Sequence, residues 1–372
     1  MFASSPRGRV PAWRLLGAVA LLGALSADCG AGVAPPPAAA SPGEWVEEEV
    51  SFQAAGMTVY GTYRRPARPP AGRGLPAVLL VAGSGPTDRD GNTPLVQGRL
   101  DSLKAVAGWL SEDGVASLRY DKLDSGRTGA GRYGGPGAEA IGLAPFEQQA
   151  AAALGHLAAR PGVDRARLGV IGHSEGALFA LLLAAGRIAG AAPVHAAGLL
   201  EPLADRYLDV IGRQFDAQVA AGLKGGTVSE GKAAELRRAY AEAVRSLRAS
   251  GTLPPEVPRE LAAVFNPGTA RFLAEADRHD PARLAAALKP GTPVLVSCSD
   301  ADIQVSCADV TRLTAGLAEA RAATRLVRLS GVSHVLKEDP SRTPDGYGRP
   351  LPFSAELRRA LHRFTATALP PR

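Results

Sequence analysis

The sequence has little of several features that place a chain in a particular class. It has three cysteines among 372 residues, at positions 29, 298 and 307. These are too few for a disulfide-rich mini-protein, and they lack the paired spacing of a zinc site. No apolar run reaches the roughly eighteen residues of a membrane-spanning helix, which excludes a multi-span membrane protein. The excess of 42 basic over 36 acidic residues is small and scattered, so we expect no nucleic-acid partner.

What the chain does have is length and apolar content. Apolar residues make up 46% of the sequence and charged residues 21%, a balance that allows a sizeable core and argues against overall disorder. The length suits one large domain or two ordinary ones.

Residues 1–28 have the layout of an export signal. Three arginines precede the apolar run Leu15–Leu25, which is too short to span a bilayer and has the length of a signal's apolar core. Cys29 follows where a lipoprotein cysteine would stand, although Asp28 occupies the position where a small residue is usual. Lipidation and an uncleaved membrane anchor are the alternatives. We expect an exported protein that is periplasmic, extracellular or a cell-surface lipoprotein, with 29–43 as a Pro/Ala-rich tether.

From residue 44 onwards the pattern alternates between strands and helices. Val46–Phe52 and Met57–Tyr63 predict an antiparallel hairpin. Apolar runs then predict strands at Leu75–Ala82, Val115–Tyr120, Leu168–Gly172 and Ala191–Leu200, with helices at Leu100–Leu110, Phe146–Ala159 and Ala177–Ala185 between them. This alternation predicts an α/β fold with a doubly wound, mostly parallel sheet.

Residues 204–283 predict a helical cap inserted into this core. Apolar residues recur every four positions from Leu203 to Val219, and Thr227 with Glu230 predicts a capping box for a second helix. Asp280 followed by Pro281 predicts another helix start. The alternation then resumes with strands at Pro293–Ser297 and Thr324–Leu329 and helices at Asp309–Leu317 and Ser354–Thr365. The predicted core is therefore 44–203 and 284–372.

Gly172–Gly176 reads Gly-His-Ser-Glu-Gly, a G-x-S-x-G motif between a predicted strand and a predicted helix. In that context the motif is a nucleophile elbow, a tight turn that raises the serine hydroxyl above the strand end. We expect Ser174 to be the nucleophile and the Glu175 N–H to point at the same space. A serine that only caps the following helix is the alternative.

A serine nucleophile needs a base and an acid that orients it. Of six histidines, His334 follows the last predicted strand, and loops at the carboxyl ends of strands gather functional groups in such sheets. The alternative for His334 is a loop histidine bonded to backbone. The acid should follow the preceding strand, where Asp300 and Asp302 compete. Spacing alone does not choose between them.

The loop after the strand Leu75–Ala82 should supply a second backbone donor to an oxyanion. It begins Gly83-Ser84-Gly85, and the glycines would let the backbone approach a ligand. The Ser84 N–H is the expected donor, and an ordinary Gly-rich connection is the alternative. The loop lacks the Lys-Ser/Thr end of a phosphate-binding loop.

With these motifs in this order, the chain resembles the α/β-hydrolase superfamily, and more narrowly bacterial serine hydrolases of the esterase and serine-aminopeptidase-like group. The resemblance rests on the loop 83–92, Arg119-Tyr120-Asp121-Lys122, the elbow and the Asp-Ile-Gln-Val of the acid loop. It implies Asp302 as the acid, and the N–H groups of Ser84 and Glu175 as the oxyanion hole. Leu123-Asp124 departs from the family's usual Arg-Gly, so the leaving-group preference does not carry over.

The expected function is hydrolysis of small-molecule carboxylic esters through an acyl-enzyme intermediate, without metal or cofactor. One alternative is a peptide or amide hydrolase of the aminopeptidase type, which would need a carboxylate near the entrance to hold a substrate ammonium group. Glu201, Asp124 and Asp88 are candidates for that carboxylate. A non-catalytic cell-surface binding protein on a hydrolase scaffold is the alternative from another class.

Cys298 and Cys307 flank the acid loop. Export to an oxidising compartment would allow a disulfide between them, which would hold Asp302 in register with His334. The alternative is two separate buried thiols.

Overall fold

The structure is a computed structural model that describes residues 44–68, 74–134 and 141–370. The expected export signal, Cys29 and the tether lie outside these residues. Within the described part of the chain, every helix is too short or too polar to cross a bilayer.

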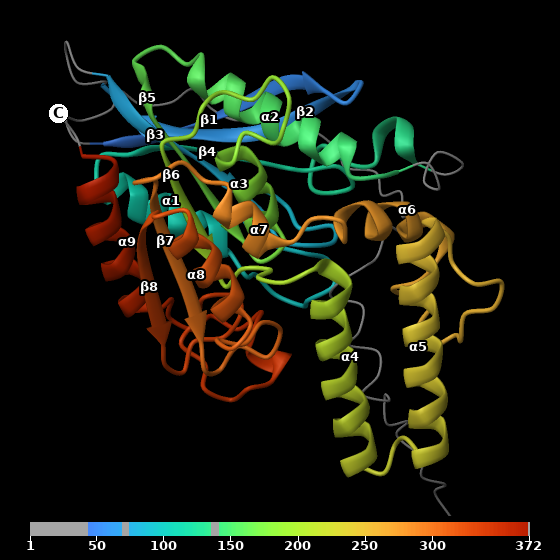
Figure 1. Ribbon diagram of the computed structural model, residues 1–372. Helices are drawn as coiled ribbons and strands as arrows, with labels where there is room; N and C mark the ends of the chain where they lie inside the picture. The colour runs from blue at the N-terminus through green and yellow to red at the C-terminus, as the bar shows by residue number, and fades with distance from the viewer. Residues whose placement is uncertain (1–43, 69–73, 135–140, 371–372) are drawn as a thin grey trace, which may run out of the picture.

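One mixed sheet of eight strands forms the centre of the molecule (Figure 1). The strands are β1 (Trp45–Ala54), β2 (Met57–Pro66), β3 (Leu75–Val81), β4 (Ala116–Tyr120), β5 (Val163–His173), β6 (Ala196–Leu200), β7 (Pro293–Ser299) and β8 (Ala323–Leu329). Their order is β1-β2-β4-β3-β5-β6-β7-β8. β1 and β2 pair antiparallel, as do β2 and β4, and every later pair is parallel. The carboxyl ends of β3, β5, β6, β7 and β8 therefore meet at one edge.

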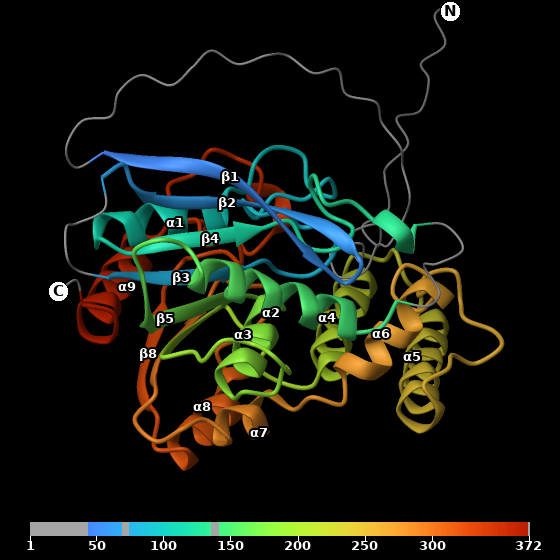
Figure 2. The same ribbon diagram turned by 90° about the horizontal axis from the view of Figure 1, so that it is seen from above.

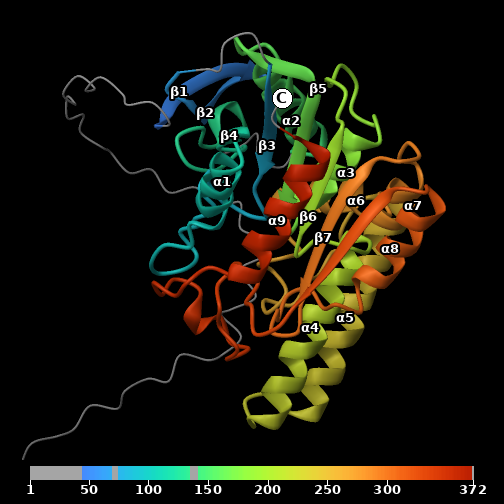
Figure 3. The same ribbon diagram turned by 90° about the vertical axis from the view of Figure 1, so that its left-hand side faces the viewer.

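Helices cover both faces of the sheet (Figures 2 and 3). α1 (Ser102–Glu112) and α9 (Ala355–Ala368) lie on one face, and α2 (Ala144–Ala158), α3 (Gly176–Ala184) and α8 (Val310–Glu319) lie on the other. Successive side chains of β3 point to opposite faces, so Leu79 packs with one helix layer and Leu80 with the other. A strand buried on both sides reads as the continuous apolar run seen in the sequence. The expected doubly wound sheet is confirmed.

Between β6 and β7 the chain forms α4 (Tyr207–Lys224), α5 (Glu230–Ser250), α6 (Pro267–Ala276) and α7 (Pro281–Ala286). We call α4, α5 and α6 with their connections the cap. α4 and α5 run side by side and project from the core (Figure 1). Phe215 of α4 stacks on Tyr240 of α5 with ring centroids 5.0 Å apart. At the base, the buried Asp277 carboxylate binds both Arg206 and Arg248.

Three local expectations differ from the structure. α5 begins at Glu230 with Ser229 as its N-cap, because the Thr227 hydroxyl bonds the Gly222 carbonyl at the end of α4 instead. β6 begins only at Ala196, since the residues before it are partly exposed. The expected boundary at 283/284 falls inside α7, which packs on α8 and therefore sits with the core helices.

Candidate active site

The turn between β5 and α3 holds Ser174 in the left-handed region, with φ 56°. Such a φ is rare for a residue with a side chain and persists only where the surroundings force it. The two glycines of the motif explain how the turn closes. A Cβ at Gly172 would lie 2.1 Å from the Gly176 carbonyl oxygen, and one at Gly176 would lie 2.2 Å from that of Val81. The elbow thus needs glycine at both positions.

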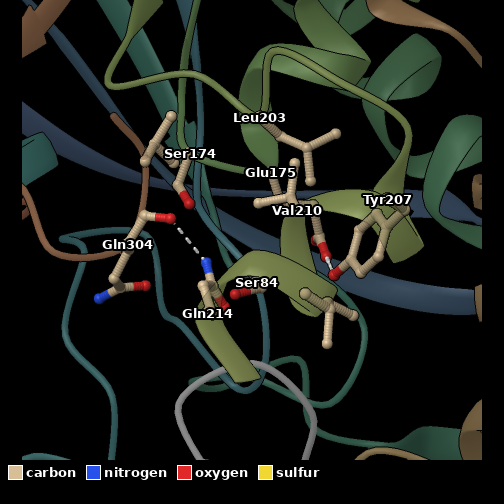
Figure 4. Close-up of a pocket in the computed structure, with 10 residues that line it drawn as sticks. Ser84, Ser174, Glu175, Leu203, Tyr207, Val210, Gln214 and Gln304 are labelled. Atoms are coloured by element: carbon tan, nitrogen blue, oxygen red, sulfur yellow. Dashed lines mark hydrogen bonds between the residues drawn. The ribbon is translucent and has the colours of Figure 1, made fainter. Parts of the chain in front are cut away.

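The loop after β3 runs close against this turn. A Cβ at Gly83 would lie only 3.2 Å from the Ser174 Cβ, so the loop backbone and the serine are neighbours. Ser84 and Glu175, the two expected backbone donors, line the same cavity as Ser174. Figure 4 shows the Ser174 hydroxyl facing this cavity.

Asp302 and His334 are in direct contact. The His334 Nδ1 lies 2.7 Å from Asp302 Oδ2, and both side chains are almost fully buried. The backbone N–H groups of Gln304 and Val305 donate to Asp302 Oδ1 at 2.7 and 3.1 Å. Burial by itself would raise the pKa of Asp302, but His334 and these donors together hold that pKa below its usual value. Asp302 is therefore an ionised acceptor for a His334 Nδ1–H.

Asp300 has a different role. Its side chain is exposed and accepts hydrogen bonds from the Gly331 N–H at 2.7 Å and the Ser330 hydroxyl at 3.1 Å. The Gly331 donor is the main reason that the pKa of Asp300 is lowered. These bonds tie the loop after β7 to the loop after β8, and no bond joins Asp300 to His334 in the described residues.

His173 is a residue whose role the sequence did not reveal. The His173 side chain is buried, and the centroid of its ring lies 4.9 Å from that of the His334 ring. Its Nε2 lies 2.7 Å from the His334 backbone oxygen, which can only accept. Burial, helped by the neighbouring His334, lowers the pKa of His173 to about 3. The ring is therefore neutral, with an Nε2–H that holds the backbone of the base.

Cys298 and Cys307 form a disulfide, with Cα atoms 5.1 Å apart. The bond closes the loop that carries Asp302. Ser299, next to Cys298, accepts hydrogen bonds from the Ala301 and Val332 N–H groups, both at 3.2 Å. The acid loop is thus tied to its own strand and to the loop that carries His334.

The cap reaches the elbow through a buried polar chain. Lys122, two residues after β4, donates to Glu175 Oε1 at 3.0 Å, and the Tyr207 hydroxyl donates to the other oxygen, Oε2. All three side chains are buried. Burial, with the negative charge of Glu175 beside it, raises the pKa of Tyr207 well above its usual value, so the tyrosine stays a donor. The sequence predicts Tyr207 as a possible contact of the cap with the acyl pocket, but it does not reveal that Tyr207 and Lys122 meet at Glu175, because these residues are far apart in the chain.

The cavity lies between the elbow, the cap and the acid loop (Figure 4) and encloses about 310 Å³ including its open mouth. Its apolar wall comes mainly from the start of α4, including Val210 and Ile211. Across the cavity, Gln214 Nε2 of α4 donates to the Gln304 carbonyl at 2.9 Å. No hydrogen bond joins Ser174 to His334 in the described residues, and catalytic hydrogen bonds of ligand-free sites are often loose.

The three carboxylates considered for a substrate ammonium group do not line this cavity. Glu201 is completely buried behind Asp302. Asp88 uses Oδ1 to accept from the N–H groups of Asp90 and Asn92 within its own loop. Asp124 lies in the turn closed by its N–H bond to the Gly129 carbonyl. None of the three candidates of the aminopeptidase alternative therefore offers a carboxylate to this cavity.

The sequence matches no family model, and no curated protein matches it. Solved structures do resemble the fold. An esterase of Pyrococcus furiosus has a TM-score of 0.53 at 14% identity, covering 92% of this chain and all of that one. The α/β hydrolase GrgF of a Penicillium species has a TM-score of 0.51 at 18% identity, and the match covers 87% of this chain and 99% of GrgF. Est1E of Butyrivibrio proteoclasticus, solved with ferulic acid bound, has a TM-score of 0.50 at 16% identity. The match covers 86% of this chain and 99% of Est1E.

At such low identities the likeness concerns the fold alone. These comparisons and the structure itself indicate one fold, since the strand order, the elbow after β5 and the loops at the carboxyl edge agree with it. The chain has the α/β-hydrolase fold.

Proposed function

We propose that the protein is a serine hydrolase that cleaves carboxylic esters through an acyl-enzyme intermediate. In this proposal Ser174 is the nucleophile, His334 the base and Asp302 the acid, and the N–H groups of Ser84 and Glu175 form the oxyanion hole. The observation that carries it is the 2.7 Å contact between His334 and Asp302, with the His334 ring 4.9 Å from that of His173, the residue before a serine at positive φ that lines a cavity.

The proposed reaction follows from these positions. The Ser174 oxygen attacks the acyl carbon while His334 Nε2 takes its proton, and Asp302 stabilises the resulting imidazolium. The two N–H groups stabilise the negative oxygen. His334 then gives the proton to the departing alcohol, and the acyl group stays on Ser174. Water, activated by the same histidine, releases the acid and restores the serine.

Ester cleavage is favoured over amino-acyl amide cleavage by what surrounds the cavity. A substrate ammonium group needs an accessible carboxylate. Glu175 is the acidic residue among those that line the cavity, and its carboxylate is occupied by Lys122 and Tyr207. The cavity wall from α4 is largely apolar, which suits an acyl chain.

A fluorophosphonate probe tests the nucleophile directly, because it reacts only with an activated serine. We expect labelling of the wild type and none of Ser174→Ala, and a matched control, Ser84→Ala, should still be labelled because it keeps its backbone N–H. An ester panel compared with amino-acyl amides then tests the substrate class. A folded wild type that is not labelled, or that turns over amides faster than esters, contradicts the proposal.

We also propose that the protein acts outside the cytoplasmic membrane, with no tether other than its N-terminus. The Cys298–Cys307 disulfide supports this location, since such bonds persist in oxidising compartments. Fractionation of cells that produce the full chain tests it, and recovery of the unprocessed protein from the cytoplasm contradicts it.

A further inference from the structure

Glu201 lies at the carboxyl end of β6, and β6 runs between the strand of the elbow and the strand of the acid loop. Its backbone is in the left-handed region, with φ 42°. The Glu201 N–H donates to the Ser297 hydroxyl at 3.1 Å, and the residue is completely buried. An acidic residue is rarely buried without a partner, so the position calls for a physical reason.

The Glu201 carboxyl group has few donors. The Ser297 hydroxyl donates to Oε1 at 3.1 Å. Oε2 is buried and receives no hydrogen bond from the described residues, and none of their cations forms an ion pair with it. The Asp302 carboxylate interacts with the Glu201 carboxyl group both through its charge and through a side-chain hydrogen bond, and both interactions raise the pKa of Glu201. Two carboxylate oxygens cannot bond each other unless one of them carries a proton.

Two buried carboxylates in contact cannot both be ionised, because each charge repels the other where little water screens them. The donors decide which one keeps the proton. Asp302 accepts from the N–H groups of Gln304 and Val305 and from His334, whereas Glu201 has Ser297 and faces the Ser299 N–H. Burial first, and Asp302 second, raise the pKa of Glu201 well above its usual value.

We propose that Glu201 is a positioning residue that carries a proton and donates it in a hydrogen bond to Asp302. That bond holds the Asp302 carboxylate on the Nδ1 side of His334, which keeps the imidazole in the tautomer that can accept the serine proton. The inference deepens the proposed function, on which its kinetic part rests.

Other groups near the pair do not replace this proton. His173, on the other side of His334, is neutral. The Tyr347 hydroxyl, within electrostatic range of both carboxyl groups, is bonded by Gln304 Nε2 at 3.4 Å. Burial raises the pKa of Tyr347 above its usual value, so it stays uncharged, and within the described residues no hydrogen bond joins its hydroxyl to either carboxyl group.

Two variants distinguish the effect of the Glu201 hydrogen-bond donor from the effect of the side chain's size. Glu201→Gln keeps the size and a donor, so kcat and the acid limb of the kcat/KM pH profile should stay close to those of the wild type. Glu201→Met keeps the size without a donor, and kcat should fall about 10- to 100-fold at nearly unchanged KM, the usual cost of losing a hydrogen bond to a buried charge. Fluorophosphonate labelling counts correctly folded sites in each sample.

Two kinetic outcomes overturn the inference. If the acid limb of Glu201→Gln moves to lower pH by a unit, the variant has removed a negative charge that favoured the imidazolium, and Glu201 is ionised in the wild type. If Glu201→Met keeps the wild-type kcat, the hydrogen bond does not position Asp302.

Infrared spectroscopy tests the proton without any substrate, so it separates failure of this inference from failure of the proposed function. The wild type at neutral pH should show the carbonyl band of a protonated carboxylic acid, and Glu201→Gln should lack it. Glu260→Gln, which removes an ion-paired carboxylate in the cap, should keep it. In Asp302→Asn the neighbouring charge is gone, so the band should disappear at a lower pH than in the wild type. A wild type without the band overturns the inference even if ester hydrolysis is confirmed.

Discussion

The loop after β7 and the cap border the same cavity, but the cap is held differently from that loop and the loop after β8 to which it is tied. The disulfide closes the loop after β7, Asp300 accepts a hydrogen bond from the Gly331 N–H of the loop after β8, and His173 at the end of β5 binds the His334 backbone oxygen. Each link fixes the backbone that carries the acid or the base. We call the loops after β7 and β8, with these links, the frame; it carries both the proposed acid and the proposed base.

The cap meets this frame through single polar side chains. Tyr207 donates to Glu175, Gln214 donates to the Gln304 carbonyl, and Arg213 pairs with Asp309 at 2.8 Å. The Tyr207 bond is buried, but the bonds of Gln214 and Arg213 are partly exposed, contribute modestly and can be exchanged with water. We therefore expect the loops to determine whether the proposed reaction occurs and the cap to determine which acyl chain enters. The predictions below test this division.

The largest effect should come from the nucleophile and base. Ser174→Ala and His334→Ala should each lower kcat for a short ester by several orders of magnitude, because either loss disables the same catalytic unit. The double variant should be little worse than either single one. Ordinary turnover by a folded Ser174→Ala protein would show that Ser174 is not the nucleophile.

The two aspartates of one loop should differ sharply. Asp302→Asn should lower kcat by roughly 10⁴, since the amide favours the wrong imidazole tautomer. Asp300→Asn is the matched control, and it should cost far less because its bonds go to Ser330 and Gly331. Steady-state kinetics of both variants decide, and the reverse order would make Asp300 the acid.

Removing the disulfide should loosen the frame. Replacing both Cys298 and Cys307 by serine should lower the free energy of unfolding by about 2–3 kcal/mol, as expected for a short closed loop, and lower kcat through Asp302. Denaturant unfolding with and without reductant measures the change in the free energy of unfolding. Alkylation of both cysteines in the native, unreduced protein would show that no bond exists.

His173 should make the frame sensitive to acid. The pKa of His173 is about 3 when folded and 6.5 in its ordinary state, so between these values the unfolded chain binds a proton that the folded chain does not. Stability is therefore full above pH 6.5 and falls as pH drops towards 3, by roughly 2 kcal/mol at pH 5.

His173→Asn keeps a neutral side chain with a donor and should remove this part of the pH dependence of unfolding. His195→Asn, at an exposed histidine, serves as the control and should leave the slope unchanged. Equal slopes for His173→Asn and the wild type would mean that His173 is not held neutral by the fold.

The smallest effect should come from the cap. Gln214→Ala removes the bond to Gln304 and should change the ratio of kcat/KM between short and long acyl esters about two- to fivefold. Gln218→Ala, one turn further along α4 and away from the cavity, should change nothing. Unchanged selectivity in Gln214→Ala would argue against the cap as the specificity element.

The sequence alone determined the features that depend on neighbouring residues. The apolar run of β3 predicts a strand buried on both faces, and the glycines around Ser174 predict the elbow, because both signals come from local sterics and burial. Chain order narrowed the base to His334 and the acid to two aspartates. For Thr227 and Ser229, local pattern was not enough, since two hydroxyls competed for one helix end.

Only the tertiary structure decided which side chains meet. His173 holds the backbone of a residue 161 positions away, and Lys122 and Tyr207 converge on Glu175 from different parts of the chain. It also placed Glu201, one of three candidates for an entrance carboxylate under the aminopeptidase alternative, in the interior next to Asp302. The physical reason is that burial and neighbouring charge set the protonation of a group, and both depend on strands that are adjacent in the sheet but distant in the sequence.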